Sequence, residues 1–234
     1  KYNIKEVHVV PGDSDEKQSV KREMGRQAGQ LLESSLYEDA IVSVTGGSTM
    51  AYVSESIHLL PFNVFFVPAR GGLGENMVYQ ANTIASSMAQ QAGGYYTTLY
   101  VPDNVSESTY NTLMLEPSVS HTLDKIKQAN VTIHGIGDAL KMAHRRQSHK
   151  DVIDKLQHHQ AVGEAFGYYF DAQGHIVHKV KTIGLQLEDL ESKDFIYAVA
   201  GGQSKGEAIK AYLSIAPDNT VLITDEAAAK VILN

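Results

Sequence analysis

Glycines and hydroxyl residues placed directly after an apolar run suit the binding of a phosphate. The segment TGGST, residues 45–49, follows the β-branched run at 41–44 and precedes apolar residues at helical spacing. Glycines let the backbone approach a ligand, and amides at a helix start can donate to an anion together with nearby hydroxyls. This segment predicts an anion-binding turn, or alternatively a tight turn that only caps a helix. Its candidate ligand residues are Thr45, Gly46, Gly47, Ser48 and Thr49.

A second segment, FIYAVAGGQSKGEAIKAYL (residues 195–213), repeats this order of residue types. An apolar run leads to Gly201 and Gly202, then to Ser204, and Lys205 falls in the first turn of a predicted helix. The helix dipole disfavours a lysine there, so Lys205 indicates a compensating anion nearby. The alternative is a solvated lysine at the surface.

Arginines follow two other predicted strands. Arg70 comes directly after the apolar run at 64–67, and the doublet Arg145-Arg146 lies a few residues beyond the strand end GIGD at 135–138. Planar guanidinium groups bind phosphate oxygens in pairs, so these side chains are candidate phosphate clamps. A solvated position at the surface is a stronger alternative for Arg145-Arg146 than for Arg70.

Three further residues could meet the hydroxyls of a sugar. Asp138 lies at the mouth of its strand, and Gln80 lies on the predicted helix that follows Arg70. Glu164 interrupts an apolar strand, where a carboxylate is costly unless it has partners. The alternative for Glu164 is an outward-facing strand position.

These residues must be positioned by an alternation of strands and helices. Such alternation predicts an α/β fold with a doubly wound, mostly parallel sheet and helices on both faces. Ligands collect at the carboxyl ends of strands in such sheets. Residues 161–185 predict two strands around residues 171–174, a small antiparallel annex. The predicted sheet strands are 6–10, 41–44, 64–67, 95–101, 131–135, 196–200 and 221–224, and the first predicted helix begins near Ser14.

Composition narrows the class of protein. The chain has 234 residues, of which 43% are hydrophobic, and this size predicts a single domain. Its formal charge of −7 means that no overall positive field attracts DNA. It has no cysteine, and its ten histidines show no metal-ligand spacing, so we expect no metal site and no cofactor. No apolar run is long enough for a membrane span, and no secretory signal is readable. We expect a cytoplasmic protein.

The motifs VTGGSTM, VPARGGLGE, QANTIA, GIGD, VAGGQSKGEAIKA and LITDEAAAKVIL together resemble the effector-binding domain of the SorC family of bacterial transcriptional regulators. The resemblance covers nearly the whole chain. It implies a fold of the sugar-phosphate isomerase type and a phosphorylated sugar as effector, with fructose 1,6-bisphosphate as the expected ligand. By position it implies that residues 45–49 hold one phosphate. It implies that the charges come from Arg70, Arg145, Arg146 and Lys205, while Gln80, Asp138 and Glu164 face the sugar.

The same resemblance implies an amino-terminal helix-turn-helix domain, which we expect to lie outside residues 1–234. We therefore expect residues 1–234 to be an effector-binding domain of a repressor of glycolytic genes. We also expect it to form dimers or tetramers and to meet DNA only through the amino-terminal domain.

Two other functions remain open on the same fold. Deaminases of this type carry an Asp-Gly-His signature, whereas GIGDALKMA keeps Asp138 and lacks the glycine and the histidine. A carboxylate without a proton partner favours binding over turnover, so we expect no enzyme. The third possibility is an oligomerisation module that a ligand merely stabilises.

Overall fold

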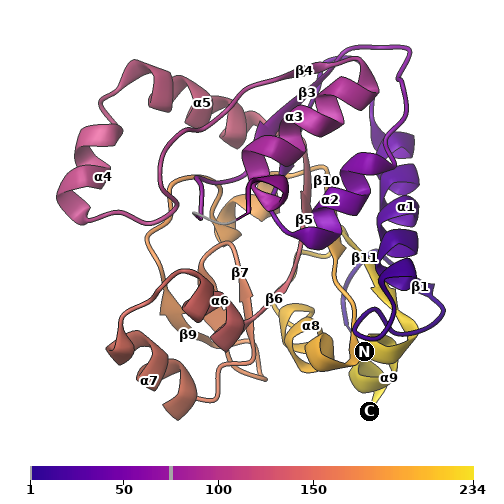
Figure 1. Cartoon of the computed structure of the whole chain (residues 1–234), viewed down its shortest axis with the longest axis vertical. Coiled ribbons are helices and arrows are strands. Elements are labelled where there is room, and N and C mark those ends of the chain that lie inside the picture. The colour runs from indigo at the N-terminus through magenta and orange to yellow at the C-terminus, as the bar shows by residue number, and fades with distance from the viewer. Residues whose placement is uncertain (1, 74–75) are drawn as a thin grey trace.

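A seven-stranded parallel sheet forms the body of the molecule (Figure 1). The computed structural model describes residues 2–73 and 76–234. The strand order is β1-β11-β10-β5-β2-β3-β4, and every neighbouring pair is parallel. This confirms the predicted sheet. Its strands are β1 (Glu6–Val10), β2 (Ala40–Val44), β3 (Val64–Pro68), β4 (Tyr95–Tyr96), β5 (Val131–His134), β10 (Phe195–Val199) and β11 (Thr220–Asp225).

Helices cover both faces of this sheet, as predicted. Alternate residues of β10 separate the two layers, since Tyr197 and Val199 pack with α1, α2 and α3, whereas Ile196 and Ala198 pack with α5, α8 and α9. The helices of the first layer are α1 (Gln18–Ser35), α2 (Ser48–Glu55) and α3 (Ala81–Ala92). Those of the second layer are α5 (Pro117–Gln128), α8 (Gly206–Tyr212) and α9 (Glu226–Leu233).

The predicted antiparallel annex is a second sheet of order β6-β7-β8-β9. It has one turn more than predicted, because Phe166 and Gly167 adopt φ of 53° and 88° and divide the first predicted strand. It also gains a strand from the loop after β5. The annex consists of β6 (Gly137–Asp138), β7 (Gly163–Ala165), β8 (Tyr168–Phe170) and β9 (Ile176–Lys179), with α6 (Ala139–Arg145) and α7 (Lys150–His158) packed against it.

Two predicted boundaries differ from the structure. The strand expected at 95–101 ends at Tyr96, because beyond it Leu99 bonds to the Asn82 side chain through its own N–H (2.8 Å) and C=O (3.1 Å). The first helix begins at Gln18 and not near Ser14, because the Ser14 N–H donates to an Asp225 carboxylate oxygen at 2.8 Å.

The remaining helices are short. They are α4 (Glu107–Leu113) and the 3₁₀ turns η1 (Met77–Tyr79), η2 (Leu187–Ser192) and η3 (Gln203–Lys205). Among the helices of the described residues, none has the length and apolar character needed to cross a membrane. Within the same residues, no group of three or more histidine, aspartate or glutamate side chains is placed to hold a metal ion.

Candidate functional site

A cavity at the carboxyl ends of the central strands brings together every predicted ligand residue except Arg146. The loops after β2, β3, β5 and β10 all reach it, together with β7 of the annex. This is where ligands collect in sheets of this kind. The predicted residues that line the cavity are Thr45, Gly46, Gly47, Ser48, Thr49, Arg70, Gln80, Asp138, Arg145, Glu164 and Lys205.

The turn after β2 is held close to η1. A Cβ on Gly46 would lie 2.5 Å from the Tyr79 carbonyl oxygen, and Gly47 has a φ of 130° and donates its N–H to that oxygen at 2.8 Å. Only glycine meets both requirements without strain. The Thr45 hydroxyl accepts from the Gly135 N–H at 3.2 Å, which ties the ends of β2 and β5 together.

The start of α2 offers donors to the cavity. The helix begins at Ser48 without a side-chain cap, so the structure does not support the alternative of a turn that only caps a helix. Amides of a first helical turn have no partner inside the helix. Within the described ranges, the hydroxyls of Ser48 and Thr49 make no hydrogen bond to the protein. The donors at this end of the cavity are therefore open to an anion, with the helix dipole behind them.

A cluster of cations forms another part of the cavity wall. Lys205, Lys141 and Arg145 all contribute to the cavity. Burial lowers the pKa of the Lys205 ammonium, and the charge of Lys21 lowers it further, with smaller contributions from Lys141 and Arg145. Asp15 opposes this shift of the pKa. Among the described residues the Lys205 ammonium has no hydrogen bond or ion pair, so this wall is a site of positive charge that an anion would balance.

The two glycine segments differ in how their amides are used. In the second segment the Gly202 N–H donates to Asp225 at 2.7 Å and the Ser204 N–H donates to Asp15 at 2.8 Å. Of that segment, the described residues that line the cavity are Val199 and Lys205. Lys205 also closes η3 and precedes α8, so the prediction that it lies in the first turn of the α-helix is wrong. The sequence order alone could not show that two distant aspartates occupy these amides.

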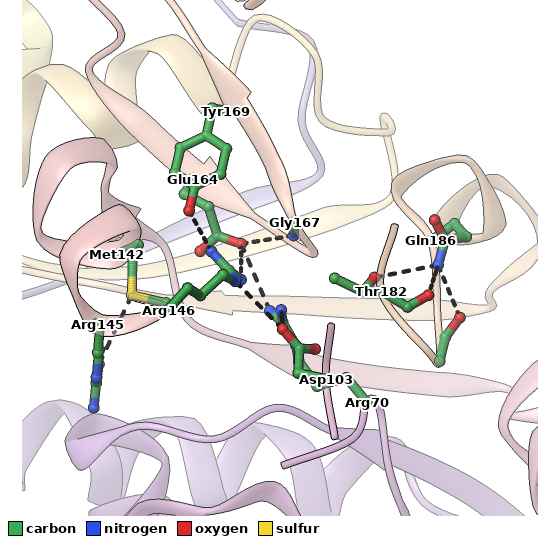
Figure 2. Close-up of polar contacts among 11 residues, drawn as sticks. Arg70, Asp103, Met142, Arg145, Arg146, Glu164, Gly167, Tyr169, Thr182 and Gln186 are labelled. Carbon is green, nitrogen blue, oxygen red and sulfur yellow. Dashed lines mark hydrogen bonds and ion pairs between the residues drawn. The ribbon is translucent and has the colours of Figure 1, made fainter. Parts of the chain in front are cut away.

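Arg70 lies at the cavity wall but is already paired with a carboxylate (Figure 2). Its side chain is buried, and its Nε and Nη2 donate to the two oxygens of Asp103 at 2.6 and 2.5 Å. Its Nη1 lies 3.6 Å from a Glu164 oxygen. Arg70 is therefore oriented by a bidentate pair, which fixes both its direction and its depth in the wall.

Arg146 lies beneath the cavity and not in it. Its Nη2 donates to Glu164 at 2.7 Å, its Nη1 donates to the Tyr169 hydroxyl at 2.7 Å, and its Nε lies 3.3 Å from Asp103. Burial disfavours its charged form, yet Glu164, Tyr169 and Asp103 together hold the pKa of Arg146 above its usual value. The doublet is thus divided, because Arg145 lines the cavity and Arg146 is 1% exposed among these partners.

Glu164 has the partners that a carboxylate in an apolar strand requires. It is buried, so the outward-facing alternative is wrong, and its Oε1 accepts from Arg146 and from the Gly167 N–H at 2.6 Å. Burial raises the pKa of Glu164, but Arg146 and then Arg70 lower it by more, and the net direction is downward. Glu164 is therefore held ionised at the cavity wall.

The other two predicted sugar contacts begin helices. Asp138 precedes α6, and its Oδ1 accepts from the Lys141 N–H at 2.8 Å. Gln80 precedes α3, and its side-chain oxygen lies beside Gly72. Both residues line the cavity at these helix starts.

Three residues of the site escaped the sequence reasoning. Lys141 lies one helical turn after Asp138, and that spacing was the signal that could have found it. Asp103 lies in a loop whose Pro-Asp-Asn sequence is typical of a surface turn. Tyr169 lies in an apolar strand, where its hydroxyl gave no local signal.

The comparisons with known proteins agree on one family. A family model described as a sugar-binding domain matches residues 1–234. The central glycolytic genes regulator of Priestia megaterium is 49% identical over 232 residues, which are 98% of this chain and 68% of that regulator. The chain belongs to the sugar-binding domains of the SorC family.

Other SorC-family relatives extend this result to sequence and structure. The central glycolytic genes regulator of Bacillus subtilis is 47% identical over 235 residues, covering 100% of this chain and 69% of that protein. The crystal structure of a SorC family regulator from Enterococcus faecalis superposes with a TM-score of 0.93 at 44% identity, covering 99% of this chain and 96% of that one. The predicted resemblance and fold are confirmed.

Proposed function

We propose that this SorC-family domain binds a phosphorylated sugar, with fructose 1,6-bisphosphate as the best candidate, and that binding changes how the regulator assembles and meets DNA. The observation that supports the proposal is one cavity lined by two groups that could each bind an anion. One is the open start of α2, and the other is the unpaired Lys205 with Lys141 and Arg145. The names of the two glycolytic gene regulators support a ligand from sugar metabolism.

The charges of the cavity favour phosphates at its two ends and hydroxyls between them. Arg70 and Arg146 are matched by Asp103 and Glu164, so this network adds little net charge. The helix dipole gives an anion about 0.3–1 kcal/mol, and each charge-assisted hydrogen bond adds about 1.5–3 kcal/mol. Three or four such contacts together support a millimolar to micromolar dissociation constant.

The polar groups of the cavity suit binding better than proton transfer. No histidine is among its described lining residues. His134, near the end of β5, is fully buried. Burial lowers its pKa to about 4, so this ring is neutral, and its Nε2 lies 2.9 Å from the Tyr212 hydroxyl. Glu164 is held ionised by two arginines, which makes it a weak proton donor. We therefore propose a sensor without catalytic turnover.

The rival function is a sugar-phosphate isomerase or deaminase. The purified chain should convert neither hexose nor triose phosphates faster than an Asp138→Asn variant does. Proton NMR of the sugar mixture measures the rate of conversion. Turnover by the wild type that the variant loses would establish the enzyme and reject the sensor.

Sensing and passive stabilisation differ in assembly. A ligand at a hundred times its dissociation constant adds about 2.7 kcal/mol to stability in either case, so a melting shift does not separate them. Sensing requires that the ligand prefer one assembly state. Sedimentation measures the assembly state of the chain with and without fructose 1,6-bisphosphate, and a parallel assay measures operator binding by the regulator with its DNA-binding domain. The assembly state and operator binding should change together when the ligand is added. Saturating ligand that alters neither would reject the regulatory role and leave passive stabilisation.

A further inference from the structure

Asp103 links the arginine network to a loop outside the two sheets. Its carboxylate is 1% exposed and accepts three guanidinium contacts, two from Arg70 and one from Arg146 (Figure 2). Both oxygens take part in the fork with Arg70, and Arg70 lines the cavity. The position of a cavity-wall cation is therefore set by a residue that does not line that cavity.

The backbone of Asp103 is bonded to the cavity wall as well. Its N–H donates to the Gly72 carbonyl at 2.8 Å, and its own carbonyl accepts from the Ile183 N–H at 3.0 Å. The Gly72 N–H donates in turn to Val101 at 2.9 Å. Since Gly72 lines the cavity, the segment around Asp103 and the cavity wall form one hydrogen-bonded unit.

Residues 99–116, which we call the arm, include Val101 and Asp103 of this unit. Helix α4 within the arm buries none of its residues and lies at the left edge of the view in Figure 1, away from the sheet. Farther along, the arm has an exposed ion pair between Glu107 and Lys181 at 2.6 Å. Exposed pairs contribute about 0–1 kcal/mol, so the buried attachment at Asp103 is stronger than this ion pair.

We infer that Asp103 is a positioning residue of the ligand cavity, which holds Arg70 in place for the ligand and couples the cavity wall to the arm. This inference rests on the proposed function, because it assigns to Arg70 a ligand contact. In an Asp103→Asn variant, the amide nitrogen faces a guanidinium N–H and cannot accept its hydrogen bond. Arg70 then loses one half of its fork and shares Glu164 with Arg146.

A double-mutant cycle tests whether Asp103 acts through Arg70. The dissociation constant of fructose 1,6-bisphosphate is measured by calorimetry for the wild type, Asp103→Asn, Arg70→Lys and the double variant. Each single variant should raise the dissociation constant about tenfold or more. The dissociation constant of the double variant should be within about threefold of that of the weaker-binding single variant, because the effects of coupled residues are not additive. Losses that multiply, or an Asp103→Asn variant within twofold of the wild type, would overturn the inference.

The control variant is Glu107→Gln, which removes the exposed ion pair between the arm and Lys181 without touching Arg70. It should bind fructose 1,6-bisphosphate within twofold of the wild type. A loss as large as that of Asp103→Asn would assign the effect to the arm as a whole and contradict a role through Arg70. If Asp103→Asn fails to fold, Asp103→Glu replaces it in the cycle with the same expected non-additivity, since its longer side chain shifts the fork while keeping the charge.

A readout without ligand separates this inference from the proposed function. Hydrogen exchange of the arm amides should rise at least fivefold in Asp103→Asn and less than twofold in Glu107→Gln. If the wild type binds no phosphorylated sugar, the proposed function fails. If the arm amides exchange equally fast in the wild type and in Asp103→Asn, the coupling of the arm to the cavity wall is rejected, whatever the ligand results are.

Discussion

Gly46 and Lys205 line the same cavity, although β5 lies between the strands β2 and β10 that precede them. Two inter-strand spacings separate these strands, roughly 10 Å. The open amides of α2 and the unpaired ammonium therefore share a cavity that could take a ligand with two anionic groups.

Lys205→Met should weaken a phosphorylated sugar by about 10- to 150-fold, the equivalent of one charge-assisted hydrogen bond of about 1.5–3 kcal/mol. A neutral sugar should be affected far less. The ligand-free variant should be at least as stable as the wild type, because it no longer buries an unpaired ammonium. Calorimetry and thermal unfolding measure these effects. Lys210→Met, on the helix α8 that follows Lys205 and outside the cavity, is the matched control. Equal losses for both sugars would assign Lys205 a structural role.

Ligand binding should take up protons at pH values near the lowered pKa of the free Lys205 ammonium. The pKa of Lys205 is lowered in the free protein, and an anion beside the ammonium would raise it again. Affinity should therefore fall as pH rises through the free-state pKa of Lys205, below the range of ordinary lysines. The unfolded chain binds more protons than the free folded protein there, so the stability of the free protein should rise with pH over the same window. Calorimetry in buffers of different ionisation heat measures the uptake, which Lys205→Met should abolish.

The arginine doublet should divide into two different roles. Arg146→Met removes a buried partner of Glu164 and Asp103, and loss of one member of a buried pair costs about 3–5 kcal/mol. Urea unfolding should show this loss. Arg145→Met alters an exposed side chain, so it should change stability by less than about 0.5 kcal/mol and weaken the phosphorylated sugar instead. Similar unfolding free energies for the two variants would contradict the division.

Gly46→Ala should impair binding more than Gly135→Ala. The added methyl group at position 46 would lie 2.5 Å from the Tyr79 carbonyl oxygen and displace η1 from the turn, whereas a methyl group at position 135 would meet its nearest neighbour at 3.8 Å. Calorimetry with fructose 1,6-bisphosphate measures the difference. Equal affinities of the two variants would mean that the packing of η1 against the turn is not needed for the ligand.

The sequence predicted which residues share the cavity because one rule governs it. Carboxyl ends of parallel strands meet at one edge of a sheet, so residues after β2, β3 and β10 must come together wherever they lie in the chain. That rule predicts that Gly46, Arg70 and Lys205 lie together, and all three line the cavity. The rule does not depend on side-chain conformation, and so it applies to residues that are far apart in the sequence.

The pairing of charges could not be predicted in the same way. Arg145 and Arg146 are consecutive at the end of a helix, where neighbours point in different directions, and no local pattern shows which one faces inward. Asp103 reaches Arg70 from a loop that shows no periodicity. Asp15 and Asp225 occupy the amides of the second glycine segment through tertiary contacts alone. Such partners depend on the packed fold and leave no spacing in the sequence.

We expect a doubly phosphorylated sugar to occupy the cavity that the start of α2 and Lys205 line. The most direct measurement is a calorimetric titration of the wild-type chain with fructose 1,6-bisphosphate and, separately, with fructose. The account predicts saturable binding of the bisphosphate with a dissociation constant between micromolar and millimolar, and no measurable binding of fructose in the same range. Equal affinity for the two sugars, or no binding of the bisphosphate, would contradict it.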